Sequence, residues 1–422
     1  MTVPDAFSDP KGTDRVDSTV RRDYTPENDS CIDSRPSGGN VTGCRNIIRL
    51  SFAMAATAVA IGSLALGMTL GAPAAGGASK IKIPGKVSFP WGTFHLAGRI
   101  GKNIRAKKSL TFDLSYQAIA EPGAPDLLRV GLKEGAAWVK KKYGMNIKVH
   151  LIGTPSTTTP TQISQIKSLT SAGEVTCVGV EPVTPGAFVS VINSTISAGV
   201  PVMTVNTDSP KSHRLAYYGV DDTTPKSPLW TGRIAGNFTV RWAKKHHVKL
   251  KSVALITGTT TAAWAQGRMT GWLETVKKAF PKVKVVGSPT NAFTTGYTPA
   301  TIESDMQAFM TGHRTVQFYF DSDWGAAEIA QLIGSKGLKG KVFTLGFNVD
   351  STYIKDLKAG TLIGTIDQRY DLQARNFVEG CANFLLGNKK PKPYEFIKPS
   401  IWTPTNVSRA IKLYKSIPGS LT

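Results

Sequence analysis

Apolar and polar positions along the chain form a regular series of alternating strand-like and helix-like segments. The run "LTFDLSY" at residues 110–116 is typical of a short buried strand, and apolar residues recur with helical spacing from Leu127 to Tyr143. Further strands are predicted at 146–154, 175–182 and 200–206, with helices between them at 160–173 and 185–199. Because helices of this length separate consecutive strands, the pattern predicts a parallel sheet with right-handed crossovers.

A second series of the same kind follows without a long linker. Its strands are expected at 215–220, 251–258, 283–289, 316–320, 341–347 and 362–367, and its helices at 226–245, 263–279, 298–311, 323–336 and 350–359. Two such series in succession predict an α/β protein with two doubly wound parallel-sheet lobes.

An uncharged stretch of 22 residues, Leu50 to Gly71, precedes the first series and follows the basic residues Arg45 and Arg49. Together with the small residues that end at Ala74, it matches a secretory signal, although its length would also suit an uncleaved membrane anchor. Residues 45–74 are therefore predicted to be a signal peptide or an anchor. Either way, we expect an exported protein in the periplasm or at the outer face of the cytoplasmic membrane.

The segments on either side of this stretch lack a periodic apolar pattern. Residues 1–44 are polar and are expected to be disordered, or to lie upstream of a true start near Val41. Residues 75–108 are rich in Gly, Pro and Lys and are interpreted as a basic spacer with one short helix near Phe94–Ile104, so that the folded part begins at Leu110.

Two cysteines, Cys177 and Cys381, lie in the exported part of the chain. Each falls in an apolar pattern, which favours two buried thiols over a disulfide, although an exported compartment would permit the bridge.

The formal net charge of +22 suggests an anionic partner, but its distribution weakens that inference. Basic residues are spread singly and in short clusters such as Lys107-Lys108 and Lys140–Lys142, at predicted helix ends or loops. Such clusters are typical of solvated faces, and no nucleic-acid partner is predicted.

Polar side chains follow almost every predicted strand, where a parallel sheet gathers its ligands. They are Glu181, Asn206, Asp208, Asp221, Asp222, Thr257, Asp321, Asp323, Asn348, Asp350, Asp367 and Gln368. The competing explanation is helix N-capping, which we favour for Asp222 and Asp350.

Five segments carry a further pattern, and in chain order they are "VTCVGVEPVTPGAFVSVINSTISAGVPVMTVNTDSP", "AYYGVDDTTPKSPLWTGRIAG", "VALITGTTTAAWAQGRMTGW", "VFTLGFN" and "IGTIDQ". Taken together, they resemble type I periplasmic binding proteins, the ribose- and galactose-binding sort that serve ATP-driven importers, and the resemblance extends over residues 110–410. It implies an N-terminal lobe of 109–220 plus 368–402 and a C-terminal lobe of 221–367 plus 403–415. The hinge strands would cross near Asp221, Gln368 and Thr403.

The resemblance also implies ligand-binding positions. Asn206 stands where such proteins place a sugar-binding acid. Asp208, two residues on, is expected to lie near the ligand, to shape the loop or to neutralise Arg268. The other implied positions are the arginine Arg268, the stacking aromatic Tyr297, the carboxamide position Asp321, the pair Phe347-Asn348 and the hinge-side Gln368. Asn206 and Asn348 replace carboxylates, and Glu181 stands where Asn is common, so the ligand's identity stays open.

The residue types at these positions suit a polyhydroxyl ligand. Planar Asp, Asn, Gln and Arg side chains can bond two neighbouring hydroxyls, and aromatic faces pack on the C–H faces of a sugar ring. Tyr116, Trp264 and Trp324 follow strand ends and are further aromatic candidates, and Asp323 is a further polar candidate.

The resulting prediction is an extracytoplasmic, monomeric substrate-binding protein that closes around a sugar or polyol and delivers it to an ABC permease with its ATPase. A membrane-anchored sensor domain is the main alternative. A sugar-responsive repressor shares the lobe pair but would need a helix-turn-helix before residue 110. No H-E-x-x-H, G-x-S-x-G or zinc spacing occurs in the chain, so no catalysis, metal or cofactor is predicted.

Overall fold

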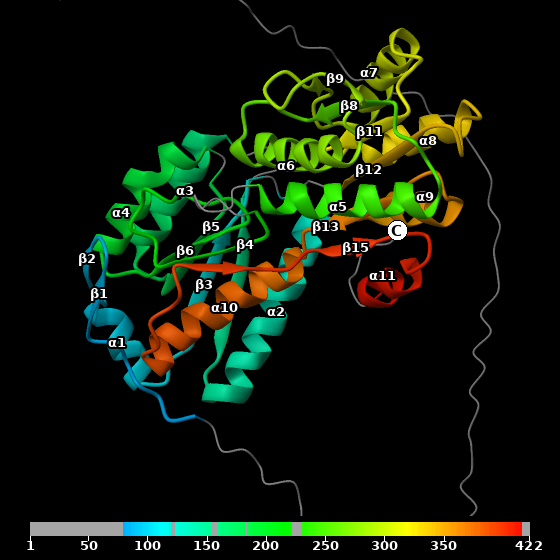
Figure 1. The fold of residues 1–422 in the computed structure, drawn as a ribbon. Helices are drawn as coiled ribbons and strands as arrows, with labels where there is room; N and C mark the ends of the chain where they lie inside the picture. The colour runs from blue at the N-terminus through cyan, green and yellow to red at the C-terminus, as the bar shows by residue number, and fades with distance from the viewer. Residues whose placement is uncertain are drawn as a thin grey trace, which may run out of the picture. The chain divides into compact units, whose positions relative to one another are not determined.

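The first lobe is built on a parallel sheet with the strand order β14-β7-β6-β5-β3-β4 (Figure 1). The computed structural model describes residues 79–117, 119, 123–153, 158–182, 184–221 and 229–415. The strands are β3 (Leu110–Ser115), β4 (Ile147–Ile152), β5 (Cys177–Val180), β6 (Val202–Val205), β7 (Ala216–Gly219) and β14 (Tyr394–Phe396). Its helices are α2 (Ala124–Tyr143), α3 (Thr159–Ala172), α4 (Val189–Ser197) and α10 (Tyr370–Gly387), with a 3₁₀ turn at Pro185–Phe188.

The second lobe has the strand order β10-β8-β11-β12-β13-β15, with β9 paired to β8. The strands are β8 (Ser252–Thr257), β9 (Lys284–Val286), β10 (Phe293–Thr294), β11 (Phe318–Asp321), β12 (Phe343–Phe347), β13 (Gly364–Asp367) and β15 (Ser400–Trp402). The helices are α5 (Trp230–Lys245), α6 (Ala263–Ala279), α7 (Pro299–Gly312), α8 (Ala326–Ser335), α9 (Ser351–Ala359) and α11 (Val407–Tyr414). The predicted pair of doubly wound lobes is confirmed.

The chain crosses between the lobes after β7, after β13 and between β14 and β15, in agreement with a three-segment hinge. The third crossing comes earlier than residue 403, because β15 pairs antiparallel with β13 in the second sheet. Asp367 fastens this crossing, since its carboxylate accepts hydrogen bonds from Trp402 Nε1 at 2.8 Å and from the Tyr414 hydroxyl.

The segment expected to be a spacer is folded onto the first lobe. It contains a hairpin of β1 (Lys86–Phe89) and β2 (Gly92–His95), followed by α1 (Gly98–Arg105). Phe94, Ile100 and Ile104 are buried, and Ser79 N–H donates to the Lys142 carbonyl at 2.7 Å. The predicted short helix is therefore present, but the spacer interpretation is wrong for residues 79–108.

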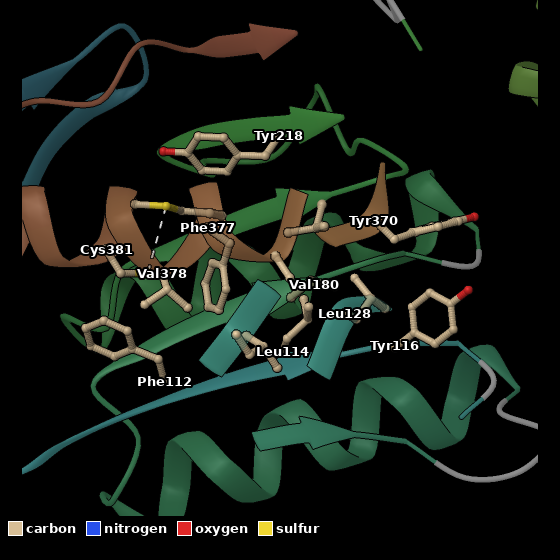
Figure 2. Close-up of a cluster of buried hydrophobic side chains, with 14 of the residues drawn as sticks. Phe112, Leu114, Tyr116, Leu128, Val180, Tyr218, Tyr370, Phe377, Val378 and Cys381 are labelled. Atoms are coloured by element: carbon tan, nitrogen blue, oxygen red, sulfur yellow. Dashed lines mark hydrogen bonds between the residues drawn. The ribbon is translucent and has the colours of Figure 1, made fainter. Parts of the chain in front are cut away.

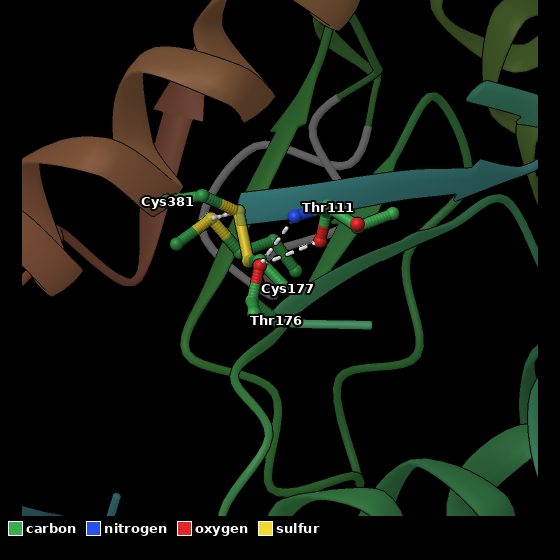
Figure 3. The surroundings of a disulfide bond; sticks show 5 residues. Thr111, Thr176, Cys177 and Cys381 are labelled. Atoms are coloured by element: carbon green, nitrogen blue, oxygen red, sulfur yellow. Dashed lines mark hydrogen bonds between the residues drawn. A yellow bond between two sulfur atoms is a disulfide. The ribbon is translucent and has the colours of Figure 1, made fainter. Parts of the chain in front are cut away.

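Helix α10 returns from the second lobe and packs beside α2 and across the first sheet (Figures 1 and 2). There Cys381 on α10 meets Cys177 on β5, and the two form a disulfide with Cα atoms 6.2 Å apart (Figure 3). The prediction of two free thiols is wrong, because 204 residues separate these cysteines and only the packing of α10 brings them together.

Two further expectations concern single features of the chain. Asp350 caps α9 by accepting from Thr352 N–H at 2.7 Å and Tyr353 N–H at 3.0 Å, as predicted.

Asp222 and the expected leader, signal or anchor segment lie outside the described residues. Within the described ranges, no helix is long and apolar enough to cross a membrane.

Candidate ligand-binding site

Arg268, on α6, is buried at the carboxyl end of the second sheet and forms an ion pair with Asp221, directly after β7. Its Nε lies 3.3 and 3.2 Å from the two Asp221 carboxylate oxygens, and its Nη2 donates to Oδ2. Nη1 donates to the Ser322 carbonyl at 3.0 Å. Asp221 also accepts from the Thr231 hydroxyl, so this carboxylate is held from both sides.

The hydrogen bonds continue from Arg268 into the hinge. Arg268 Nη2 donates to Gln368 Oε1 at 2.6 Å, and Gln368 Nε2 donates to Asn348 Oδ1 at 2.6 Å and to the Tyr370 hydroxyl at 3.1 Å. Gln368 is 2 % exposed, so its amide orientation is set by these partners rather than by water. We name Asp221, Arg268, Gln368 and Asn348 the hinge network.

Two aromatic rings flank the guanidinium of Arg268. Its central carbon lies 4.2 Å from the ring centroid of Phe347 and 4.7 Å from that of Trp264. Cation–π contacts of this kind hold a guanidinium in place where water is excluded. The structure therefore brings together Arg268, Phe347, Asn348, Gln368 and Trp264, as the sequence predicted.

The guanidinium stays charged in this setting. Burial alone would lower the pKa of Arg268, but the Asp221 carboxylate, by its charge and hydrogen bonds, raises the pKa above its ordinary value. The positive charge of Arg268 is thus already neutralised by the Asp221 carboxylate. Its contacts use four of its five N–H donors, and one N–H on Nη1 has no partner among the described residues.

Glu181 and Asn206 form a second polar pair, at the carboxyl end of the first sheet. Asn206 Nδ2 donates to Glu181 Oε1, and the Glu181 carbonyl accepts from Gln162 Nε2 at 2.7 Å. Asn206 has a φ of 61°, a left-handed conformation that Asn tolerates better than most residues. Asn348, the other amide that replaces a family carboxylate, has a φ of 74°.

Three buried hydroxyl or amide atoms at strand ends have no hydrogen-bond partner among the described residues, and one carboxylate oxygen, Asp321 Oδ2 at the end of β11, has none either. The three are Ser115 Oγ at the end of β3, Asn206 Oδ1 after β6 and Asn348 Nδ2 after β12. Leaving such a group unsatisfied costs about 1–3 kcal/mol, so native proteins pair nearly all of them. These atoms lie at the carboxyl ends of strands in both sheets.

Of the roles predicted for Asp208, the structure supports shaping of the loop after β6. Its carboxylate accepts from Arg214 Nη2 at 2.6 Å and from Arg214 Nε, and also from the Thr204 hydroxyl at 2.6 Å. Arg214 in turn donates to the Pro393 carbonyl at 2.8 Å, next to β14. Asp208 therefore holds the loop after β6, and the idea that it neutralises Arg268 is wrong because Asp221 does so.

Of the two candidate acids after β11, Asp323 lies closer to the hinge network. Its charge is among those that raise the pKa of Arg268. The Tyr297 side chain is 55 % exposed. It lies close to Asp323, because a Cβ added to Gly258 would come within 2.6 Å of the Tyr297 ring and 2.9 Å of Asp323 Oδ2. Asp321 packs instead near Gly325 at the start of α8, where burial and then Asp323 raise its pKa well above the ordinary value.

The first lobe contributes Tyr116, whose ring meets the Tyr370 ring edge to face with centroids 6.5 Å apart (Figure 2). Gly123, before α2, lies against the second lobe, because a Cβ there would be 3.2 Å from the Val349 carbonyl oxygen and 3.6 Å from the Trp324 ring. Both lobes thus meet around the hinge network.

The site residues that sequence reasoning missed are Ser115 and Tyr370. Asp221 was visible as a polar strand end, but nothing in the sequence linked it to Arg268, 47 positions away. Across the described part of the chain, no group of three or more His, Cys, Asp and Glu side chains is arranged to hold a metal ion.

Residues 126–389, more than half of the chain, match the model of the periplasmic binding protein domain family. No curated protein sequence matches the chain significantly. Solved structures share its fold. A glucose-galactose binding protein from Geobacillus stearothermophilus is 21 % identical with a TM-score of 0.59, and the match covers 71 % of this chain and 99 % of that one.

Two structures of transporter solute-binding proteins in complex with D-arabinose are also similar. The protein from Burkholderia graminis is 23 % identical with a TM-score of 0.60, over 71 % of this chain and 96 % of that one. The protein from Agrobacterium radiobacter is 20 % identical with a TM-score of 0.62, over 73 % of this chain and 99 % of that one.

Proposed function

Because this chain belongs to the periplasmic binding protein family, we propose that it captures a sugar or similar polyhydroxyl compound between its lobes and delivers it to an ABC importer. The observation that carries this proposal is the set of buried hydroxyl and amide atoms at the strand ends of both sheets that have no partner among the described residues: Ser115 Oγ, Asn206 Oδ1 and Asn348 Nδ2. Asn348 belongs to the hinge network, and the aromatic neighbours of Arg268 in that network offer apolar faces.

The chemistry of these atoms suits hydroxyl groups. A hydroxyl donates one hydrogen bond and accepts others, so it can satisfy the acceptor Asn206 Oδ1 and the donor Asn348 Nδ2 alike. Phe347 or Trp264 would receive the C–H face of a sugar ring beside the guanidinium. These contacts would come from both lobes, which favours closure around the ligand.

The ligand is proposed to be neutral. Asp221 already matches the charge of Arg268, so an anionic ligand would find no free cation in the hinge network. Asn206 and Asn348 provide hydrogen bonds without charge at two positions where related sugar sites use acids. This reasoning favours sugars and polyols over anionic metabolites.

Export and delivery are supported by other features of the chain. Disulfides persist in oxidising compartments, which fits Cys177 and Cys381 in an exported protein. The 22-residue uncharged stretch before Ala72 fits a signal or anchor. Solute-binding proteins are prominent among the similar structures, which supports a permease with its ATPase as the partner and a binding role rather than catalysis.

A thermal-shift panel of sugars, polyols, amino acids and nucleosides, run on the chain from Ala75 onward, tests the proposal. This portion contains every described residue. We expect stabilisation by at least one sugar or polyol. A clear shift with an amino acid, together with no shift for any sugar or polyol, would overturn the proposed ligand class.

A further inference from the structure

One end of the first lobe is strongly basic. Residues 79–86, 102–108, 140–148 and 389–392 together contain fourteen Lys or Arg and no Asp or Glu. We name these four segments the basic end. All fourteen side chains are exposed except that of Lys142, which is half-buried.

Backbone and side-chain contacts bring the four segments together, although they lie far apart in the sequence. Lys82 N–H donates to the Leu386 carbonyl at 2.7 Å, just before the last segment, and Ser79 N–H donates to the Lys142 carbonyl at 2.7 Å. Leu110 N–H donates to the Asn146 carbonyl at 3.1 Å, which joins the second segment to the third. Lys390 Nζ donates to the Ser88 carbonyl at 2.6 Å.

The basic end is at the amino ends of β3 and β4, opposite the strand ends that form the ligand site. Its charges affect one another, because burial and then the neighbouring Lys389 lower the pKa of Lys142. Like charges gathered on one surface repel each other, and an anionic partner relieves that repulsion.

The surface of the basic end is also hollowed. A cavity of about 280 Å³ lies between the hairpin and α1, and Lys86, His95 and Arg105 are among the residues that line it. Gly98 and Gly101 of α1 form part of its wall. This combination of cationic side chains and a recess suits a phosphate-containing headgroup.

We propose that the basic end binds the surface of a membrane rich in anionic phospholipids and holds the first lobe against it. The described chain begins on this end at Ser79, and the uncharged stretch that closes at Gly71 precedes it by only seven residues, 72–78. Seven residues span at most about 25 Å when extended. A chain still anchored by that stretch would keep this end near the bilayer, and a cleaved chain would bind by charge alone.

The second lobe provides a matched control surface. Lys244 and Lys245 end α5, and Lys277 and Lys278 end α6, so this lobe also has exposed lysine pairs at helix ends. These lysine pairs do not lie beside the amino-terminal segment that begins at Ser79. The proposal predicts that the position of a lysine cluster on the molecule, and not the net charge of the protein alone, decides lipid binding.

Vesicle sedimentation tests the proposal, using the chain from Ala75 onward with either equimolar phosphatidylglycerol and phosphatidylcholine or phosphatidylcholine alone. We expect binding at least tenfold tighter to the anionic vesicles, falling at least tenfold between 50 mM and 500 mM salt as screening increases. The quadruple variant Lys107→Gln, Lys108→Gln, Lys140→Gln and Lys141→Gln should lose at least tenfold in affinity.

The matched variant Lys244→Gln, Lys245→Gln, Lys277→Gln and Lys278→Gln should change affinity less than twofold. Equal losses in both variants would overturn the proposal, since net charge alone would then account for binding. Equal binding to neutral vesicles would also overturn it, as would tighter binding to heparin than to anionic vesicles. Unchanged melting temperatures would show that both variants are folded, and sugar binding should persist in both, which separates this test from that of the ligand site.

Discussion

Arg268 Nη2 donates to Gln368 Oε1 at 2.6 Å across 100 residues of sequence, and this bond ties the second lobe to the hinge. The same guanidinium is neutralised by Asp221 at another crossing between the lobes. One side chain therefore links two hinge segments with the centre of the candidate site. Under the proposed function, a ligand bound beside Arg268 would act on the segments where the chain crosses between the lobes.

Replacing Arg268 by Ala should abolish the thermal shift with sugar and destabilise the protein by about 3–5 kcal/mol, because Asp221 becomes a buried, unpaired charge. Arg214→Ala is the matched control, since it breaks the other buried Arg–Asp pair, with Asp208, away from the hinge network. Urea unfolding should show a similar loss for both variants, whereas only Arg214→Ala should still respond to the ligand. Normal sugar binding by Arg268→Ala would remove Arg268 from the site.

Asn206→Asp should destabilise the protein at neutral pH, because the new carboxylate would face Glu181 where the amide now donates to it. Two adjacent acids raise the pKa of one of them in the folded state. The penalty should therefore be small near the unfolded-state pKa values of about 3.9 and 4.3, and should grow as pH rises toward the raised folded pKa. Melting temperatures of variant and wild type at pH 4 and pH 7 measure it, and a gap of equal size at both pH values would contradict this account.

Glu328, on α8, should contribute to a loss of stability as pH rises. Burial, and then the charges of Asp350, Asp356 and Glu303, raises the pKa of Glu328 to about 7. The folded state thus retains a proton that the unfolded chain releases above about pH 4.3, so stability falls between that pH and about 7. Glu328→Gln should flatten this fall in a plot of melting temperature against pH. Glu274→Gln, on α6, is the control and should leave the wild-type slope in place, because Glu274 is exposed and is not among the charges that raise the pKa of Glu328.

Removing the disulfide by the double substitution Cys177→Ala and Cys381→Ala should lower the free energy of unfolding by about 2–5 kcal/mol, as expected when a long loop is released. Wild type treated with dithiothreitol under unfolding conditions should shift toward the variant, and the variant itself should not respond to the reductant. A reductant response of the same size in both proteins would show that the bridge is not the source of the stability.

Much of the fold was predictable because each element carries a local signal. The apolar spacing and terminal residues of α6 predicted its bounds at Ala263 and Ala279, and the glycine that ends α2 was read correctly. The hairpin was missed, and α1 was predicted only as a short helix within a spacer, because residues 79–108 have few apolar positions and these are explained only by their packing onto the first lobe.

The site was predictable in part. Arg268, Phe347, Asn348 and Gln368 were identified from motifs and lie together in the structure. Asp208 was predicted to be a site residue because it follows a strand, but its carboxylate forms an ion pair with Arg214, six residues further along the chain. A short-range partner of this kind has no periodic signature in sequence.

The sequence by itself determined the two alternating series, the strand ends that gather polar groups and the amides at 206 and 348, because periodicity and turn chemistry act over a few residues. Only the tertiary structure decided which of those groups pair. Asp221 reaches Arg268, Cys177 reaches Cys381, and four separate basic segments converge on one end of a lobe. Each of these depends on how α6, α10 and the amino-terminal segment pack, and packing joins residues whose separation along the chain carries no information about their distance in space.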